Sequence, residues 1–111
     1  MGLRSYHNHS VFCDGKNTIE EMTRAAIAAG MSAIGFTGHG TYPKDLRYCT
    51  KPEDFPAYVD AVKACKEKYA GDIQVWLGVE NEFYGVEPDF CWDYALGATH
   101  YIVKNGVDYF V

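Results

Sequence analysis

The four histidines of this chain are the residues whose types and spacing could do chemistry, and each lies in or beside an expected strand, His100 nearer the middle of its strand than the end. His7 and His9 are separated by one residue. His39 stands between two glycines, and His100 follows the small residues Gly-Ala-Thr. A carboxylate, Glu80, ends a further apolar run. Imidazole nitrogens and carboxylate oxygens are ligands of zinc and related divalent ions, so the set predicts a metal-dependent hydrolase.

Each candidate ligand also has a plainer interpretation. Side chains two apart in a strand face the same side, so His7 and His9 could meet one ion, or they could be two surface histidines. His39 could bind a metal, or it could bond only to the backbone of its glycine turn. Asp14 could bind a metal, or it could form a turn with Gly15. All four histidines avoid the expected helices, and this distribution favours a shared site.

Two carboxylates alternate at the end of the same apolar run. Glu80 is expected to point into the site, where its two oxygens could bridge two cations. Glu82 has the same alternation, and we expect it to be a solvated carboxylate at the rim. Ser10 lacks the strand–turn–helix context of a catalytic serine, so a serine nucleophile is not expected.

Strands and helices are expected to alternate along the chain. The apolar patterns predict strands over residues 3–9, 32–37, 73–80 and 96–103, and helices over residues 18–30, 53–71 and 88–94. Thr18 is a favourable N-cap, and Asn105-Gly106 is a turn signal. The alternation predicts an α/β fold in which helices cover a parallel sheet. The carboxyl ends of its strands would meet at one edge and gather the candidate ligands there.

Length and composition predict one folded domain. The chain has 111 residues, 48% of them hydrophobic, and a formal net charge of −5. An acidic chain without clustered Lys and Arg argues against a nucleic-acid partner. With no apolar leader and no run of about 20 apolar residues, we expect a cytoplasmic protein without a membrane partner. The four cysteines are then expected to be reduced, with disulfides as the alternative.

Taken together, the motifs are similar to those of a known family. In order and spacing they resemble the opening motifs of PHP-domain phosphoesterases, and residues 93–106 look most like the histidinol-phosphatase branch. The motifs that carry this resemblance are His7-Asn8-His9-Ser10, Cys13-Asp14-Gly15, Gly35-Phe36-Thr37-Gly38-His39-Gly40, Gly78-Val79-Glu80 and Gly97-Ala98-Thr99-His100.

The resemblance implies a fold and a reaction. The fold would be a distorted, TIM-like (β/α)7 barrel, of which residues 1–111 form one PHP segment with about the first four β/α units, truncated at its C-terminus. The reaction would be the hydrolysis of L-histidinol phosphate to L-histidinol and phosphate, a step of histidine biosynthesis. A water bridging two or three zinc, iron or manganese ions would attack the phosphorus atom.

The resemblance also assigns ligand roles by position. His7 and His9 would hold a first metal, which Glu80 would bridge to a second metal held by His100. Asp14 and His39 would contribute to a third metal. The side chains that contact the substrate and take part in catalysis are expected in later motifs of the family.

Two features depart from the family pattern. Gly38 stands where an aspartate usually precedes the histidine of the second motif, so a carboxylate that orients an imidazole would be missing. Family members are also longer, and residues 1–111 lack their later metal ligands and barrel-closing strands. We therefore expect self-association or completion by a further segment. A non-catalytic metal-binding remnant and a PHP phosphodiesterase or exonuclease are the alternatives to a histidinol phosphatase.

Overall fold

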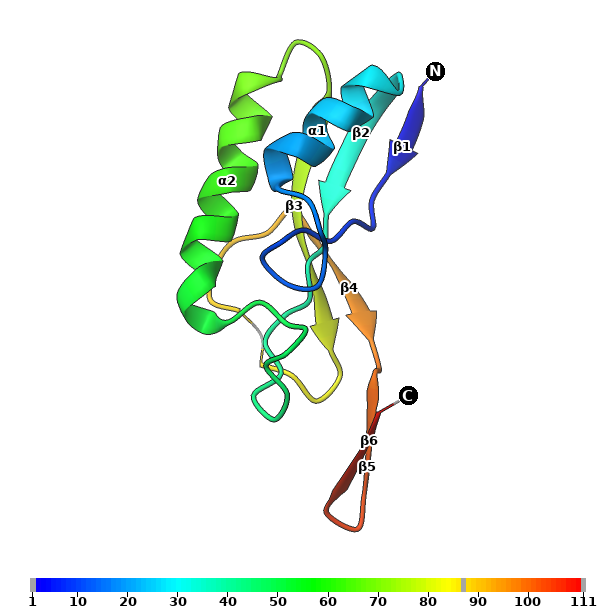
Figure 1. The fold of residues 1–111 in the computed structure, drawn as a ribbon, viewed down its shortest axis with the longest axis vertical. Helices are drawn as coiled ribbons and strands as arrows, with labels where there is room; N and C mark the ends of the chain where they lie inside the picture. Colours follow the sequence, from blue (N-terminus) through cyan, green and yellow to red (C-terminus); the bar gives the residue numbers. More distant parts are fainter. Residues whose placement is uncertain (1, 87, 111) are drawn as a thin grey trace.

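Four parallel strands form the sheet that positions the candidate ligands (Figure 1). The structure is a computed structural model that describes residues 2–86 and 88–110. The strands are β1 (Leu3–Ser5), β2 (Met31–Phe36), β3 (Gln74–Glu82) and β4 (Tyr94–Ala98), side by side in the order β1-β2-β3-β4. Because each strand pairs with the next and the order never reverses, the sheet winds in one direction, as in a barrel. The fold is therefore α/β, with the four strands forming a curled half-barrel.

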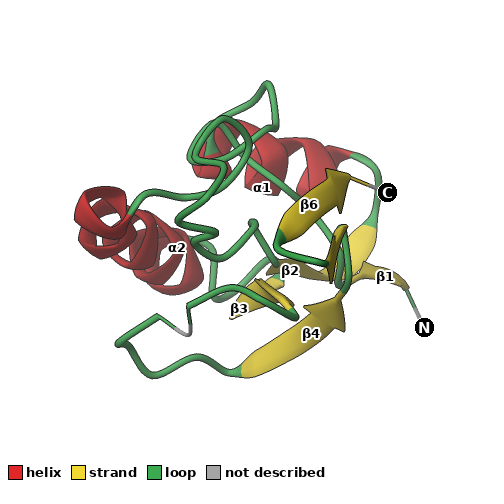
Figure 2. Cartoon of the chain, turned by 90° about the horizontal axis from the view of Figure 1, so that it is seen from below, coloured by secondary structure: helices red, strands yellow, loops and turns green. Residues whose placement is uncertain are grey.

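Two helices cover one side of this sheet (Figures 1 and 2). Helix α1 (Ile19–Ala28) begins at Thr18, whose hydroxyl accepts a hydrogen bond from the Glu21 amide at 3.1 Å. The Glu21 carboxylate accepts in return from the Thr18 amide at 3.0 Å, which completes a capping box. The helix is followed by Gly30, whose φ of +80° suits glycine. Helix α2 (Phe55–Lys68) follows a short 3-10 turn, η1 (Pro52–Asp54).

The core lies between these helices and the sheet. Its buried side chains come mainly from alternate positions of β3 and from one stripe of α2, as their spacing predicts. Tyr58 of α2 ties the two layers together, because its hydroxyl donates to the carbonyls of Phe36 at 3.0 Å and Gly78 at 2.7 Å. The strands are thus held rigidly against α2 close to the points where the ligands emerge.

The opposite face of the sheet carries one large side chain across its middle. Tyr94 lies over Gly35 and Gly78, where an added Cβ would collide with the phenol ring. Its hydroxyl donates to the Tyr6 carbonyl at 2.6 Å, so it links the β4 edge to the segment after β1. Glycine is needed at both positions because the ring occupies the space of a side chain.

The structure corrects one predicted helix. Residues 88–93 form an irregular segment with bends and Tyr94 begins β4, although the pattern of residues 88–94 predicts a helix. Phe90 packs on Phe55 and Tyr58, with ring centroids 5.4 and 6.5 Å apart, and Asp93 accepts a hydrogen bond from the Leu77 amide at 2.8 Å. These side chains bind the segment to α2 and β3 through tertiary contacts, which a local sequence pattern does not contain.

Two predicted strands are also shorter than expected. The first strand ends at Ser5, so residues 6–9 lie outside any strand. The expected strand over residues 96–103 divides into β4 and β5 (Tyr101–Lys104), with His100 between them. Strand β5 pairs antiparallel with β6 (Val107–Phe110). The turn between them is the predicted Asn105-Gly106, with φ values of +52° and +76°.

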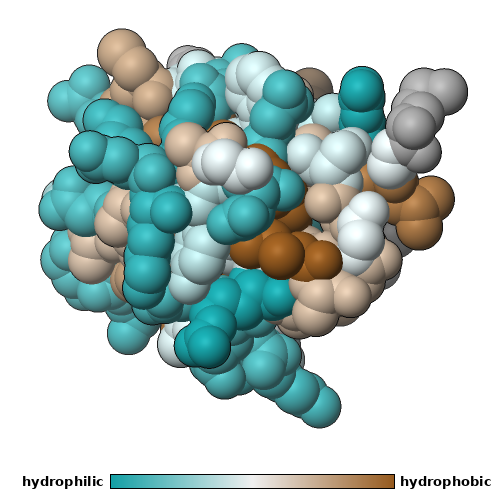
Figure 3. Space-filling model, turned by 90° about the horizontal axis from the view of Figure 1, so that it is seen from above, coloured by the Kyte–Doolittle hydropathy of each residue, from teal (hydrophilic) through white to brown (hydrophobic). Residues whose placement is uncertain are grey.

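The two ends of the sheet differ in character. Figure 1 shows the β5–β6 hairpin projecting beyond the carboxyl ends of the strands, which gives the chain its long dimension of 51 Å. The other end, where the strands begin, shows hydrophilic side chains with brown hydrophobic patches between them, one at the centre of the view (Figure 3). Neither helix in the described part of the chain has the length and apolar character of a membrane span. All four cysteines carry free thiols.

Candidate metal centre

All six candidate ligands converge at the carboxyl ends of the four strands. Each is delivered by a strand or by the segment that leaves it, as expected for a parallel α/β sheet. The residues are His7, His9 and Asp14 after β1, His39 after β2, Glu80 near the end of β3, and His100 after β4.

The first two histidines are aimed by the asparagine between them. The side-chain Nδ2 of Asn8 donates to the backbone carbonyl of Gly35 in β2 at 2.9 Å, and the backbone carbonyl of Asn8 accepts from the backbone amide of Thr37 at 2.9 Å. With Asn8 fixed against the sheet, the flanking side chains of His7 and His9 are both free to enter the site. Their Nε2 atoms lie 3.2 Å apart.

Glu80 is the buried centre of the arrangement, with a side chain that is only 7% exposed. Its Oε1 lies 3.2 Å from His7 Nε2, and its Oε2 lies 3.1 Å from His9 Nε2 and 3.0 Å from His39 Nδ1. His39 is held beside it because the Glu80 amide donates to the Gly38 carbonyl at 3.0 Å, and the Gly40 amide donates to the Glu80 carbonyl at 2.8 Å.

These contacts fit shared coordination better than hydrogen bonding. Among the described residues, Glu80 Oε2 has no hydrogen-bond partner of acceptable geometry, although two imidazole nitrogens face it closely. Two nitrogens bound to one tetrahedral ion at about 2.0–2.1 Å lie roughly 3.3 Å apart. The Nε2 atoms of His7 and His9 are separated by nearly the same distance, 3.2 Å. A buried carboxylate oxygen without a donor is costly, and a cation would satisfy it.

Asp14 lies between His9 and His39. One carboxylate oxygen is 2.7 Å from His9 Nδ1, and the other is 3.1 Å from His39 Nε2. Burial acts to raise the pKa of Asp14, but the hydrogen bond with His9 and the charge of His39 lower it overall, so the carboxyl is ionised. Burial, followed by the charge on His9, lowers the pKa of His39 and favours its neutral, metal-binding form.

His100 is positioned by a residue whose role the sequence reasoning missed. Glu82 Oε2 lies 2.7 Å from His100 Nδ1, and its two oxygens accept from the His100 backbone amide at 2.9 Å each. The Glu82 side chain is 6% exposed, so the expectation of a solvated rim carboxylate is wrong. A carboxylate on Nδ1 leaves Nε2 of the same ring to face an ion. The sequence did contain a sign of this role, because residues two apart in a strand share a face. Glu82 therefore lies on the same face of β3 as Glu80, beside the end of β4.

The ligand atoms form three groups that share members. Within each group one ligand atom per residue lies within 4.8 Å of the others. The groups are His7, His9 and Glu80; His9, Asp14 and His39; and His39, Glu80 and His100. Two of the groups share the buried carboxylate of Glu80, and clusters of nitrogen and oxygen donors that share a carboxylate suit adjacent divalent ions.

Comparison with known proteins agrees with this geometry. The PHP domain family matches residues 5–110, nearly the whole chain. The chain belongs to the PHP-domain family.

Relatives of this PHP chain include proteins named for one activity. A Deinococcus radiodurans protein named a probable histidinol-phosphatase is 34% identical over 118 aligned positions, covering 96% of this chain and 45% of the relative. A Listeria monocytogenes crystal structure, described provisionally as a histidinol phosphatase, matches with a TM-score of 0.78 and 18% identity, over 96% of this chain and 48% of that one.

A Lactococcus lactis histidinol phosphate phosphatase, solved with zinc, L-histidinol and phosphate, matches with a TM-score of 0.74 and 20% identity. That match covers 95% of this chain and 42% of the other. The PHP chain therefore spans less than half the length of each of these three relatives.

A Cβ could be accommodated at Gly38, the position where family members usually have an aspartate. A Cβ added there would lie 3.4 Å from Cys13 Sγ and 3.7 Å from Thr50 Oγ1, which are ordinary contact distances. Thr50 Oγ1 is buried and has no hydrogen-bond partner among the described residues. In the absence of a carboxylate at 38, Asp14 is the carboxylate that contacts the distal nitrogen of His39.

Proposed function

We propose that this chain is a metal-dependent phosphomonoesterase segment of the histidinol-phosphatase type, acting on L-histidinol phosphate. The observation that carries the proposal is the sharing of His9, His39 and Glu80 among three groups of ligand atoms. Adjacent cations of this kind are suited to phosphate esters, whose oxygens they can neutralise together. The names of the relatives and the zinc, L-histidinol and phosphate of the Lactococcus lactis structure support the substrate and the metal.

The roles proposed for the ligands follow their contacts. His7, His9 and Glu80 would hold one ion, Glu80 and His100 would contribute to a second, and Asp14 and His39 would contribute to a third. Bound divalent ions would supply an acidified water and positive charge for the phosphoryl oxygens. Zinc, iron and manganese are the candidate metals.

The protein residues around the ligands would set their orientation. Asn8 anchors the two histidines on either side of it to β2. Glu82 fixes the ring of His100 through Nδ1, and the pairing of Gly38 and Gly40 with Glu80 fixes the backbone of His39. A second candidate function is metal binding without turnover.

Phosphate release from L-histidinol phosphate tests the proposal. The purified chain would be stripped with a chelator, reloaded with zinc, iron(II) or manganese(II), and assayed beside His9→Ala and Lys63→Ala, the latter an exposed position on α2. We expect metal-dependent release by the wild type and Lys63→Ala, and its loss in His9→Ala. Metal uptake without release by the wild type would support the second candidate. Release that His9→Ala retains in full would contradict the ligand assignment.

A further inference from the structure

The ligand group of His9, Asp14 and His39 has fewer donors to give than its membership suggests. His9 presents its Nε2 atom to His7 and Glu80, 3.2 and 3.1 Å away, and is therefore engaged with the first ion. Asp14 and His39 are then left to hold the third ion. Zinc sites usually take at least three protein donors. A thiol lies beside these two residues and has no part in the ligand sets described above.

Cys13 precedes Asp14 in a tight turn that follows His9. The backbone amides of Cys13 and Gly15 both donate to the Ser10 carbonyl, at 3.1 and 2.9 Å. Gly15 passes so close to His9 that an added Cβ would lie 2.7 Å from the His9 carbonyl oxygen. The turn is therefore packed closely against His9, and it keeps the side chains of Cys13 and Asp14 beside the candidate metal centre.

The Cys13 thiol contacts the Asp14 carboxylate directly. Its Sγ lies 3.4 Å from Asp14 Oδ1, the oxygen that faces His9 Nδ1 at 2.7 Å. A sulfur and an oxygen bound to one tetrahedral zinc ion at about 2.3 and 2.0–2.2 Å lie roughly 3.5 Å apart. The observed separation of sulfur and oxygen therefore suits two ligands of one ion.

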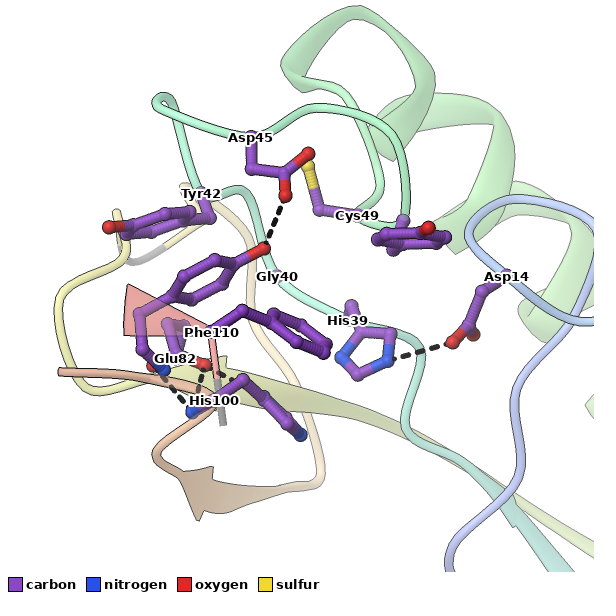
Figure 4. A pocket seen from close by; sticks show the side chains of 11 residues that line it. Asp14, His39, Gly40, Tyr42, Asp45, Cys49, Glu82, His100 and Phe110 are labelled. Atoms are coloured by element: carbon purple, nitrogen blue, oxygen red, sulfur yellow. Dashed lines mark hydrogen bonds and ion pairs between the residues drawn. The ribbon is translucent and has the colours of Figure 1, made fainter. Parts of the chain in front are cut away.

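Cys13 also lies against the segment that carries His39. A Cβ added at Gly38 would be 3.4 Å from Cys13 Sγ, so the sulfur is next to the backbone one residue before His39. Figure 4 shows the Asp14 carboxylate turned toward the same imidazole, where its Oδ2 is 3.1 Å from His39 Nε2. The other ring nitrogen faces Glu80 Oε2, which is buried and has no hydrogen-bond partner among the described residues. Such an oxygen points to cations in this cluster.

The other three thiols are placed differently. Cys65 belongs to the hydrophobic core, and Cys91 is exposed. Cys49 lines a cavity of about 310 Å³ beside His39, but Figure 4 shows its sulfur pointing away from His39. Cys13 is therefore the thiol placed to reach a ligand group, and Cys49 is a matched control for it.

We propose that Cys13 binds the third ion as a thiolate, together with Asp14 and His39. The S–H proton would pass to solvent as the metal–sulfur bond forms, because a coordinating thiol is deprotonated. One thiolate and one carboxylate balance the charge of a divalent ion, and the neutral imidazole adds none. Sulfur ligands favour zinc over manganese, so this position would select zinc from the candidate metals. The inference deepens the proposed function and rests on its metal centre.

Cobalt(II) gives this ligand a signature that does not require turnover. A thiolate bound to cobalt absorbs in the near ultraviolet through charge transfer from sulfur, a band that imidazole and carboxylate ligands do not produce. The chelator-treated chain would be titrated with cobalt(II) beside Cys13→Ser and Cys49→Ser. We expect the band in the wild type and Cys49→Ser, and its loss in Cys13→Ser. A wild type without the band, or a band that Cys13→Ser retains, would overturn the proposal.

A second measurement uses the wild-type chain alone and does not depend on a variant folding. Alkylation by iodoacetamide would be followed at each cysteine by peptide mass spectrometry, with and without zinc. Zinc should slow the alkylation of Cys13 and leave that of Cys91 unchanged, because a thiolate bound to metal is less available as a nucleophile. Equal alkylation of Cys13 in both conditions would overturn the proposal even if metal-dependent phosphate release were observed. Failure of that release, with the cobalt band and the protection present, would count only against the proposed function.

Discussion

At the scale of single residues, the centre depends on carboxylates that hold imidazole rings in place. Asp14 contacts His9 and His39 through separate oxygens, and Glu82 holds His100 through Nδ1 and the backbone amide. A ring held at one nitrogen has a defined tautomer, and its other nitrogen is presented to the site. Such partners of metal-binding histidines typically change metal affinity or activity 10- to 100-fold when removed.

Replacing Glu82 with glutamine tests its positioning role. Glu82→Gln should weaken the tightest zinc binding of the chain roughly 10- to 100-fold, because an amide holds the His100 ring less firmly than a carboxylate. Zinc affinity would be measured by competition with a chromophoric chelator. Glu67→Gln, on the exposed surface of α2, serves as the control. Identical zinc affinities in the two variants would show that Glu82 does not act on the site.

The pKa of His9 gives a second test at this scale. In the metal-free chain it is raised from 6.5 to about 9, chiefly by contact with the Cys13 side chain and further by Asp14, although burial opposes the rise. Because folding raises this pKa, the imidazolium stabilises the fold fully below about pH 6.5. That contribution is lost as the pH rises through about 9.

Cys13→Ala should therefore lower the pKa of His9 and flatten the loss of stability between pH 6.5 and 9. An NMR titration of the ring in chelator-treated protein measures the first effect, and denaturant unfolding across this pH range measures the second. Cys91→Ala, at an exposed position, should leave both unchanged. If the pKa of His9 were the same in the wild type, Cys13→Ala and Cys91→Ala, Cys13 would not be the cause of the raised pKa.

The sequence was informative about which residues meet but less so about their supports. The four histidines and Glu80 were singled out by residue type and by their positions in or beside strands, and the resemblance to the PHP family added Asp14; the structure brings all six together at one edge of the sheet. The burial of Glu82 was not predicted, since alternation shows which face a carboxylate leaves but not what lies opposite. The partner, His100, comes from a strand whose end was misplaced.

At the scale of elements, long periodic segments were predicted well and short irregular ones were not. Helices α1 and α2 and strands β2 and β3 follow from the spacing of apolar residues and from the Thr18 cap. The segment over residues 88–94 has the local pattern of a helix, but its aromatic side chains dock separately on α2. Tertiary contacts of this kind are absent from local sequence patterns.

The crossing of the sheet by Tyr94 yields a prediction about β2. Gly35→Ala should destabilise the chain by about 1–3 kcal/mol, because the new methyl group overlaps the Tyr94 hydroxyl. Urea unfolding would measure the free energy. Gly97→Ala is a matched control on β4, where an added Cβ meets nothing within 4 Å. In a background of Tyr94→Leu, Gly35→Ala should cost less free energy of unfolding than it does in the wild type. If the free-energy changes of the two substitutions simply added, the contact between residues 35 and 94 would not be the cause.

At the scale of the whole molecule, the sheet ends in two strands with open edges. Among the described residues β1 and β4 each pair on one side only within the sheet, and the hairpin beyond β4 exposes Ile102, Tyr109 and Phe110. Unpaired edges and exposed apolar side chains favour association with another chain. The fold thus resembles part of a barrel that leaves strand edges for further contacts.

Self-association should therefore depend on concentration and on the β4 edge. Sedimentation velocity of the wild type should show a rising weight-average mass with concentration. Ala95→Lys should reduce this rise, because a charge on an edge strand opposes pairing. Ala64→Lys on the exposed face of α2 is the control. A single monomeric species at every concentration would contradict this expectation.

The metal content of the purified chain tests the central claim, that the three overlapping groups hold divalent ions. Protein loaded with zinc and dialysed would be analysed by inductively coupled plasma mass spectrometry, beside His9→Ala. Because the shared groups should hold adjacent ions, we predict two or three zinc ions per wild-type chain and at least one fewer in His9→Ala. One ion or none in the wild type, or the same content in both proteins, would contradict the account.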